Sequence, residues 1–132
     1  MAREKKVIDA SIVAKWFLDE SDTAKALRIR NDHISGKILL VAPELLFSEV
    51  LNTLRYKGRD QQALESALEI LWDMQLHVEH TNSFILKKSI AIALQYNLTI
   101  YDALYAALAQ IHSCSLVTAD ERLKKFPLAV SL

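Results

Sequence analysis

The segment over residues 98–120 constrains the fold most, because it joins an apolar helix to a short apolar strand. Apolar residues lie on nearly every side of the predicted helix over residues 100–111, which is typical of a helix enclosed by protein. Asp102 falls in the first turn of this helix, and Asp120 follows the predicted strand over residues 115–118. Burying a carboxylate is costly unless something neutralises it. We therefore expect the carboxylates of Asp102 and Asp120 to have a neutralising partner.

Both acids also have a purely structural interpretation. Thr99 and Asp102 have the spacing of a capping box, in which the acid accepts backbone N–H bonds at a helix start. Asp120 can cap a short segment over residues 121–125 in the same way. Acids are common at helix starts, so neither acid alone indicates chemistry. A functional interpretation requires further carboxylates at the same place.

The composition favours one helix-rich domain. The chain has 132 residues, enough to bury a substantial core, and we expect a single domain over residues 1–132. Hydrophobic residues make up 52%, and only two Gly and two Pro interrupt them, which argues against disorder. Sixteen basic residues balance sixteen acidic ones, which argues against a stoichiometric nucleic-acid coat but not against an enzyme that uses metal ions.

Sequence features also predict the compartment. The lone Cys114 excludes an intrachain disulfide and fits a reducing environment. No signal peptide is recognisable, and polar residues interrupt every apolar run before it could span a bilayer. We therefore expect a cytoplasmic protein with no membrane segment.

Predicted strands and helices alternate along the chain. The strands cover residues 7–10, 38–42, 76–79, 115–118 and 128–130, and the helices cover residues 12–17, 22–34, 43–57, 61–72, 83–95 and 100–111. The helix starts are assigned to Ser11, to Ser21 or Asp22, to Pro43 in a first turn, to Asp60, and to Thr81 or Ser83. Alternation of this kind implies right-handed βαβ units. It predicts an α/β fold, a three-layer α/β/α sandwich around a parallel sheet of four to five strands.

Three acids are expected at one edge of this sheet, because ligands of open parallel sheets lie beyond the carboxyl ends of the strands. Asp9 ends the first predicted strand, and Asp120 follows the fourth. Asp102 begins the helix that leads into that fourth strand. Glu49 is a lone acid on a mostly apolar flank of its helix, and it completes the set unless it is an ordinary exposed glutamate.

Four carboxylates in one cleft would repel one another strongly, so some would hold protons at neutral pH. A divalent cation removes this conflict, and hard oxygen ligands favour Mg²⁺ or Mn²⁺. One or two such ions suit phosphoryl chemistry. The four histidines, at positions 33, 77, 80 and 112, show no ligand spacing, and we interpret them as ordinary surface or core residues.

Four segments taken together carry a family resemblance. They are VIDAS at 7–11, PELLFSEVLN at 43–52, YDALYAALA at 101–109 and LVTADERL at 116–123. In this order they resemble the PIN-domain nucleases and, within them, the VapC-type toxins of toxin–antitoxin pairs. The resemblance covers essentially the whole chain, although residues 60–98 match only in pattern.

The resemblance implies a metal-dependent endoribonuclease with an acidic cluster of Asp9, Glu49, Asp102 and Asp120. Ser11 and Thr118 match hydroxyl positions that support such a cluster by hydrogen bonds. The implied cofactor is Mg²⁺ or Mn²⁺, as one or two ions, and Glu49 either ligates a metal or orients the attacking water. The implied partners are RNA, a second copy of the chain, and a VapB-like antitoxin that covers the cleft.

Other interpretations stay open at this point. A receiver-type phosphotransfer domain also places carboxylates at strand ends, and a non-catalytic scaffold would use the acids only as caps. If the chain is a nuclease, basic residues that follow the acidic elements are candidates to hold the flanking phosphates: Lys15, Arg55, Lys57, Arg122, Lys124 and Lys125.

Overall fold

A five-stranded, all-parallel sheet forms the centre of the protein, which we describe over residues 3–132 from a computed structural model. The strands are β1 (Glu4–Ile8), β2 (Ile38–Pro43), β3 (His77–Glu79), β4 (Ser115–Val117) and β5 (Ala129–Val130). The α-helices are α1 (Ala10–Val13), α2 (Thr23–Ile34), α3 (Leu45–Tyr56), α4 (Gln61–Asp73), α5 (Ser83–Tyr96) and α6 (Ile100–His112). Two 3-10 helices, η1 (Ala14–Phe17) and η2 (Leu123–Lys125), complete the order.

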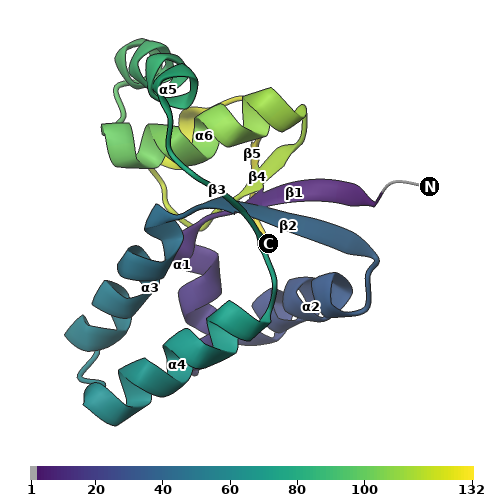
Figure 1. Cartoon of the computed structure of the whole chain (residues 1–132), viewed down its shortest axis with the longest axis vertical. Coiled ribbons are helices and arrows are strands. Elements are labelled where there is room, and N and C mark those ends of the chain that lie inside the picture. Colours follow the sequence, from purple (N-terminus) through teal and green to yellow (C-terminus); the bar gives the residue numbers. More distant parts are fainter. Residues whose placement is uncertain (1–2) are drawn as a thin grey trace.

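The strand order across the sheet is β3-β2-β1-β4-β5, with every neighbouring pair parallel. Helices α5 and α6 lie on one side of the sheet, and α1 to α4 lie on the other (Figure 1). The predicted three-layer α/β/α sandwich is therefore confirmed. The chain moves outward from β1 through β2 to β3 and then returns to β4 on the other flank of β1. This reversal places the carboxyl ends of β1 and β4 side by side, where open parallel sheets bind ligands.

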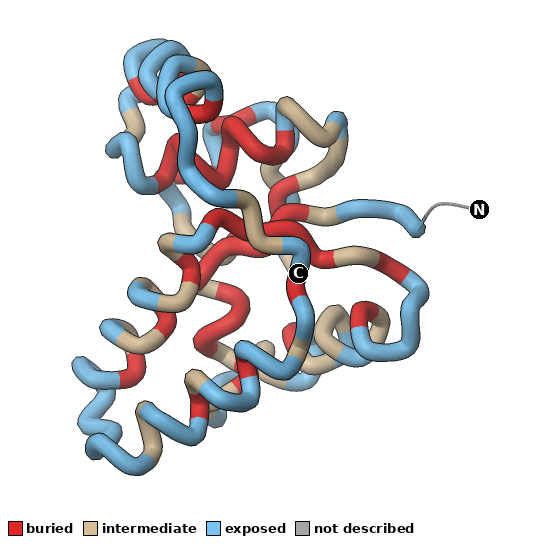
Figure 2. The backbone as a smooth tube through the Cα atoms, in the orientation of Figure 1, coloured by how far each residue is buried: buried red, intermediate tan, exposed pale blue. Residues whose placement is uncertain are grey.

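Helix α6 is the most enclosed helix of the described chain. Every residue from Asp102 to Ala109 is buried, and four of these eight are alanines whose small side chains allow close approach to the sheet. Figure 2 shows this continuous burial along α6 and the central strands. The sequence prediction of a helix surrounded by protein is confirmed.

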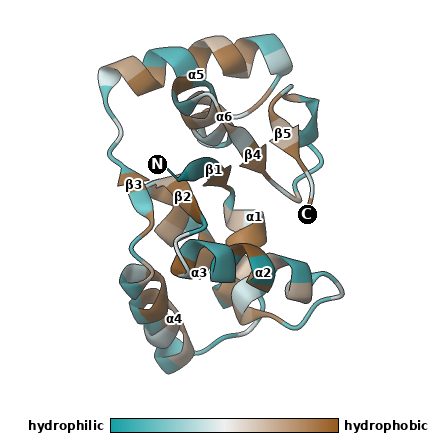
Figure 3. Cartoon of the chain, turned by 90° about the vertical axis from the view of Figure 1, so that its right-hand side faces the viewer, coloured by the Kyte–Doolittle hydropathy of each residue, from teal (hydrophilic) through white to brown (hydrophobic). Residues whose placement is uncertain are grey.

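Helix α5 packs on α6 and shields it from solvent. Its buried residues are Ile85, Ser89, Ile92 and Ala93, which recur at helical spacing on one face. The mixed hydrophilic and hydrophobic colouring of α5 in Figure 3 fits a helix with only one covered face. Among residues 3–132 no helix is long and apolar enough to cross a membrane.

The start of α3 differs from the prediction. Pro43 is the last residue of β2, paired with Glu79, and so does not begin a helix. The backbone N–H of Glu44 donates to the carbonyl of Glu79 (3.2 Å), so α3 begins only at Leu45. Strand pairing with β3 outweighs the local preference of proline for a first helical turn.

Side-chain caps also differ in part. The carboxylate of Asp60 accepts from Ala63 N (2.9 Å), as predicted. Asn82, and neither Thr81 nor Ser83, caps α5 by accepting from Ile85 N (2.9 Å). Ser11 lies inside α1 rather than at its start, and its hydroxyl donates to the carboxylate of Asp9. The hydroxyl of Ser11 therefore hydrogen-bonds the carboxylate that follows β1 and does not cap a helix.

His33 joins three elements inside the core. Its Nδ1 accepts from Leu40 N (3.1 Å), which assigns the proton to Nε2, and Nε2 donates to the carbonyl of Met74 (2.8 Å). The residue is buried. It therefore ties α2 to β2 and to the end of α4.

Replacement of His33 by alanine leaves the buried Leu40 N–H without an acceptor. We expect His33→Ala to lower the free energy of unfolding by about 2–3 kcal/mol. Urea denaturation followed by circular dichroism measures the change. His80→Ala is the matched control, because this exposed histidine should change stability by less than about 0.5 kcal/mol. Equal stability of the two variants would contradict this role for His33.

Candidate active site

Asp9 follows β1, and two hydroxyl groups hold it at the carboxyl ends of the strands. Its Oδ2 accepts from Ser11 Oγ (2.7 Å) and from Thr118 Oγ1 (2.8 Å). Its backbone N–H donates to the carbonyl of Val117 in β4 (3.1 Å). Asp9 is only 5% exposed. The carboxylate is therefore both buried and fixed in orientation.

The same hydroxyl groups connect the ends of β1 and β4. Thr118 Oγ1 accepts from the backbone N–H of Asp120 (3.0 Å), and Ser11 Oγ accepts from that of Ala119 (3.0 Å). Each hydroxyl donates to Asp9 and accepts from the β4 loop. This network places Asp120 on the same edge as Asp9.

Asp102 enters the site from the first turn of α6. The hydroxyl of Thr99 caps the helix by accepting from Asp102 N (3.1 Å). The carboxylate, in contrast to the backbone N–H, is not fully hydrogen-bonded, because its Oδ2 is buried and has no hydrogen-bond partner among the described residues. A buried oxygen without a partner costs about 1–3 kcal/mol. Capping alone therefore does not explain Asp102.

Glu49 points toward the cluster from α3, and a tyrosine orients it. Tyr105 Oη donates to Glu49 Oε1 at 2.5 Å. Tyr105 was not among the site residues predicted from the sequence, although it follows Asp102 by three positions and so shares its helix face. A partly buried Glu49 with this contact is not an ordinary exposed helix glutamate.

The pKa values show how burial and mutual repulsion act on the cluster. Burial raises the pKa of Glu49, and the negative charges of Asp9, Asp102 and Asp120 raise it further. Burial also raises the pKa of Asp9 and of Asp102, with a contribution to each from the charge of Asp120. Glu49 therefore lies close enough to the three aspartates for their charges to act on it.

Asp120 differs from the other three acids because Arg122 neutralises it. Burial acts to raise the pKa of Asp120, but the hydrogen bonds and charge of Arg122 outweigh it and hold the pKa below its usual range. The guanidinium Nη2 lies 3.0 Å from Asp120 Oδ2 and 3.7 Å from Asp102 Oδ2. Asp120 Oδ1 also accepts from Arg122 N (2.9 Å) in the turn before η2, but η2 has no side-chain cap, so the predicted capping role of Asp120 was wrong.

Only one of the six basic candidates contacts the acidic cluster, among the contacts of residues 3–132. Arg122 does so, as described above. Lys15 instead pairs with Glu20 and Asp22, and Lys124 pairs with Glu121. Arg55 lies over the ring of Tyr56, and Lys125 donates to the carbonyl of Asn97. Lys57 lies at the end of α3.

The donor set fits a divalent cation of the hard, oxygen-binding type. Three of its carboxylates have raised pKa values, and Asp102 Oδ2 accepts no hydrogen bond. The four acids are not drawn tightly together, since no three of them bring ligand atoms within 4.8 Å of one another in the described chain. Arg122 supplies the positive charge between Asp102 and Asp120.

Comparison with known proteins identifies the family of the chain. The family described as PIN domain matches residues 6–128. The chain is also 32% identical to Ribonuclease VapC3 of Pyrobaculum aerophilum, over 96% of this chain and 98% of that protein. The chain belongs to the PIN-domain family. Its similarity to a VapC protein confirms the predicted resemblance and leaves a receiver-type domain without support.

Solved structures share this fold at lower sequence identity. The sarcin-ricin-loop-cleaving toxin VapC20 of Mycobacterium tuberculosis superposes with a TM-score of 0.75 at 14% identity, covering 93% of this chain and 95% of that one. A toxin–antitoxin complex from Klebsiella pneumoniae contains a chain with a TM-score of 0.68 at 20% identity, covering 95% of both chains. These likenesses support the PIN-domain architecture of the whole described chain.

The raised pKa of Asp102 predicts a pH-dependent gain of stability when its charge is removed. Because the folded-state pKa lies above 3.8, the stabilisation from this proton is fully present below pH 3.8 and is lost as the pH rises through the folded value. In the presence of chelator, we expect Asp102→Asn to raise the free energy of unfolding at pH 7 by about 1 kcal/mol. The gain should disappear near pH 3.

Chemical denaturation at pH 3, 5 and 7 measures this dependence. Glu121→Gln is the control, because Glu121 is a highly exposed acid next to the site and should show no such gain. A loss of stability in Asp102→Asn at pH 7 with chelator would show that the charge of Asp102 is already compensated within the protein.

Proposed function

We propose that this protein is a metal-dependent endoribonuclease and the toxin of a type II toxin–antitoxin pair. The observation that carries the proposal is the buried Asp102 Oδ2, which has no hydrogen-bond partner and lies among three further acids at a strand-end edge. A scaffold that used these acids only as caps would not need a buried oxygen that accepts no hydrogen bond. Membership of the PIN-domain family and the similarity to Ribonuclease VapC3 support the same activity.

In this proposal, Asp9, Asp102 and Asp120 hold one or two Mg²⁺ or Mn²⁺ ions. A bound ion would neutralise the scissile phosphate and lower the pKa of a coordinated water. Ser11 and Thr118 keep the carboxylate of Asp9 in position through two hydrogen bonds. Glu49, held by Tyr105, either adds a ligand or orients the attacking water. Water then attacks the phosphorus in line, without help from the RNA 2′-hydroxyl, and leaves a 5′-phosphate and a 3′-hydroxyl.

Arg122 is proposed to exchange one anion for another during the reaction. Its side chain is 66% exposed while its guanidinium contacts Asp120. A cation held by Asp102 and Asp120 would supply the charge that Arg122 now supplies, which would leave the guanidinium able to bind a flanking RNA phosphate, an anion that arginine holds with two hydrogen bonds. The residue that balances the acids in the resting protein then binds substrate.

The proposed protein partners are an antitoxin of the VapB type and a second copy of the chain. The first is supported by the VapC relative and by the fold shared with a chain of the Klebsiella pneumoniae toxin–antitoxin complex. The second is supported by α5, where Leu86, Ile90 and Leu94 form an exposed apolar stripe with one residue per turn.

Removal of one carboxylate charge tests the proposed activity. We expect Asp9→Asn to reduce Mg²⁺- or Mn²⁺-dependent RNA cleavage by about 100-fold or more, because the amide keeps the shape of Asp9 but loses its charge. Gel assays with a labelled RNA measure the rate, and product analysis identifies the ends. Glu65→Gln, on the exposed part of α4, is the control of equal charge change. Cleavage that resists chelator, or equal rates for the wild type and Asp9→Asn, would refute the metal nuclease.

Replacement of Tyr105 tests the part played by Glu49. The Tyr105 hydrogen bond lowers the pKa of Glu49 against the effect of burial. We expect Tyr105→Phe to raise this pKa further, which moves the acidic limb of the pH–rate profile to higher pH. The expected loss of kcat/KM at neutral pH is about 5- to 10-fold, the worth of one hydrogen bond.

The matched control is Tyr101→Phe, because Tyr101 belongs to the same helix but is 63% exposed. A Tyr105→Phe profile that superposes on the wild-type profile would show that Glu49 has no ionisation-dependent part in the reaction.

A further inference from the structure

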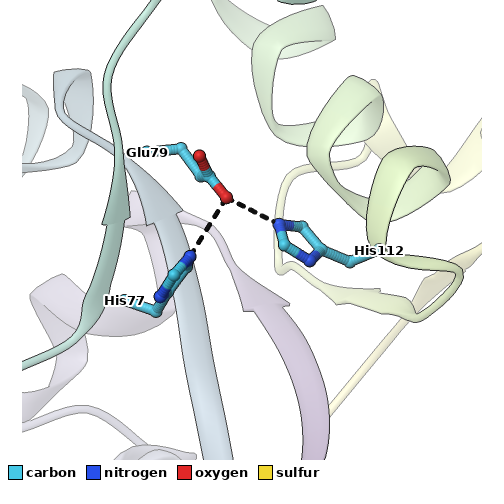
Figure 4. Close-up of side chains that lie close together, drawn as sticks. All are labelled: His77, Glu79 and His112. Atoms are coloured by element: carbon cyan, nitrogen blue, oxygen red, sulfur yellow. Dashed lines mark hydrogen bonds and ion pairs between the residues drawn. The ribbon is translucent and has the colours of Figure 1, made fainter.

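A second group of potential metal ligands lies away from the carboxylate cluster. His77 and Glu79 come from β3, and His112 is the last residue of α6. Figure 4 shows both imidazole rings directed at the carboxylate of Glu79. The two Nε2 atoms lie 3.0 Å and 2.9 Å from the same oxygen, Oε1. Within residues 3–132 this is the only group of three His, Cys, Asp or Glu residues whose ligand atoms all lie within 4.8 Å of one another.

We propose that His77, Glu79 and His112 bind a Zn²⁺ ion. Two imidazole nitrogens and one carboxylate oxygen form a donor set that zinc uses in proteins, with a fourth position open to water. A tetrahedral ion with bonds of about 2.0–2.1 Å needs its ligand atoms roughly 3.3 Å apart. The two nitrogen–oxygen separations, 2.9 Å and 3.0 Å, are close to this spacing, and all three ligand atoms lie within 4.8 Å of one another.

The backbone positions make the three side chains converge without strain on the fold. His77 and Glu79 are two positions apart in β3, so both side chains leave the same face of the strand. The end of α6 brings His112 over that face, and the side chain of His112 is only 12% exposed. The His77 side chain is 46% exposed, which gives a metal ion access from solvent.

This site is separate from the proposed RNA-cleaving site in both position and chemistry. Asp102 and His112 stand near opposite ends of α6, and a rise of 1.5 Å per residue separates them by about 15 Å. The carboxylate cluster offers only hard oxygen donors and favours Mg²⁺ or Mn²⁺. The histidine site offers nitrogen donors, which favour Zn²⁺. The two sites can therefore be loaded independently.

The zinc site has a structural task that follows from its place in the fold. Strand β3 has three residues and pairs with β2 alone, at the edge of the sheet. A metal ion would attach this short edge strand to α6, the most buried helix. The carbonyl of Glu79 also accepts from Glu44 N, where the chain enters α3. Zinc would thus hold the strand that positions the start of the helix carrying Glu49.

The experiment is zinc binding to full-length, metal-free protein that carries no histidine tag. The Asp9→Asn variant serves as background, so that the carboxylate cluster is weakened as a competing site. Competition with a chromophoric chelator should show one Zn²⁺ per chain. At about 100-fold excess of free Zn²⁺ over its Kd, the melting temperature should rise by roughly 5–10 °C. Co²⁺ in place of Zn²⁺ should give the intense visible absorption of a four-coordinate site.

Single replacements of two of the three proposed ligands test the site. His77→Ala and Glu79→Gln should each weaken Zn²⁺ binding by at least about tenfold, which at the same free Zn²⁺ cuts the rise in melting temperature to roughly half or less. His77→Ala should remain folded because its side chain is half exposed. His80→Ala is the matched control, since this neighbouring histidine is 85% exposed and lies outside the group. It should bind Zn²⁺ as the background variant does.

Two results would overturn the proposal. One is the absence of Zn²⁺ binding in the micromolar range, which would leave the group as a hydrogen-bonded trio. The other is undiminished binding in His77→Ala and Glu79→Gln, which would place the ion elsewhere. RNA cleavage by the wild type is measured separately, so failure of the zinc site and failure of the proposed nuclease are distinguishable.

Discussion

The site depends on one pair of hydrogen bonds, those that Ser11 and Thr118 donate to the same oxygen of Asp9. A buried carboxylate is destabilising unless donors compensate it, and a hydrogen bond to a charged group contributes about 1.5–3 kcal/mol. The two hydroxyls come from elements that follow β1 and β4, the neighbouring strands at which the chain reverses its direction across the sheet. The hydrogen bonds that offset the burial of the Asp9 carboxylate therefore depend on the parallel pairing of those strands.

Helix α6 carries three residues of the two proposed sites at different positions along its length. Its first turn carries Asp102, its next turn presents Tyr105 to Glu49, and its last residue, His112, faces the edge strand. The middle of the helix is enclosed by the sheet and by α5, so its two ends are held at fixed positions relative to the strands. At the first end Arg122 stands between Asp102 and Asp120 as a positive charge supplied by the chain itself.

Much of the architecture could be predicted from the sequence, and the four acids singled out there lie close enough for the three aspartates to act on Glu49. Alternating apolar runs indicated the parallel sheet, and four acids in apolar elements indicated a shared edge. The predicted start of the third helix at Pro43 was wrong because pairing of Pro43 with Glu79 is a contact between distant segments. Tyr105, the Arg122 bridge and the pairing of His77 with His112 were missed for the same reason. Each depends on where two separate elements meet.

The sequence by itself determined which residues are apolar, which are acidic, and in what order strands and helices follow one another. Those properties are local, because periodicity and capping act over a few neighbouring positions. Only the tertiary structure decided which carboxylates receive hydrogen bonds and which stay unpartnered. Asp9 and Asp102 are both buried acids, yet Asp9 has two hydroxyl donors and Asp102 Oδ2 has none. That difference arises because desolvation and hydrogen bonding depend on groups brought together by the packing of α6 against the sheet, which the order of residues does not specify.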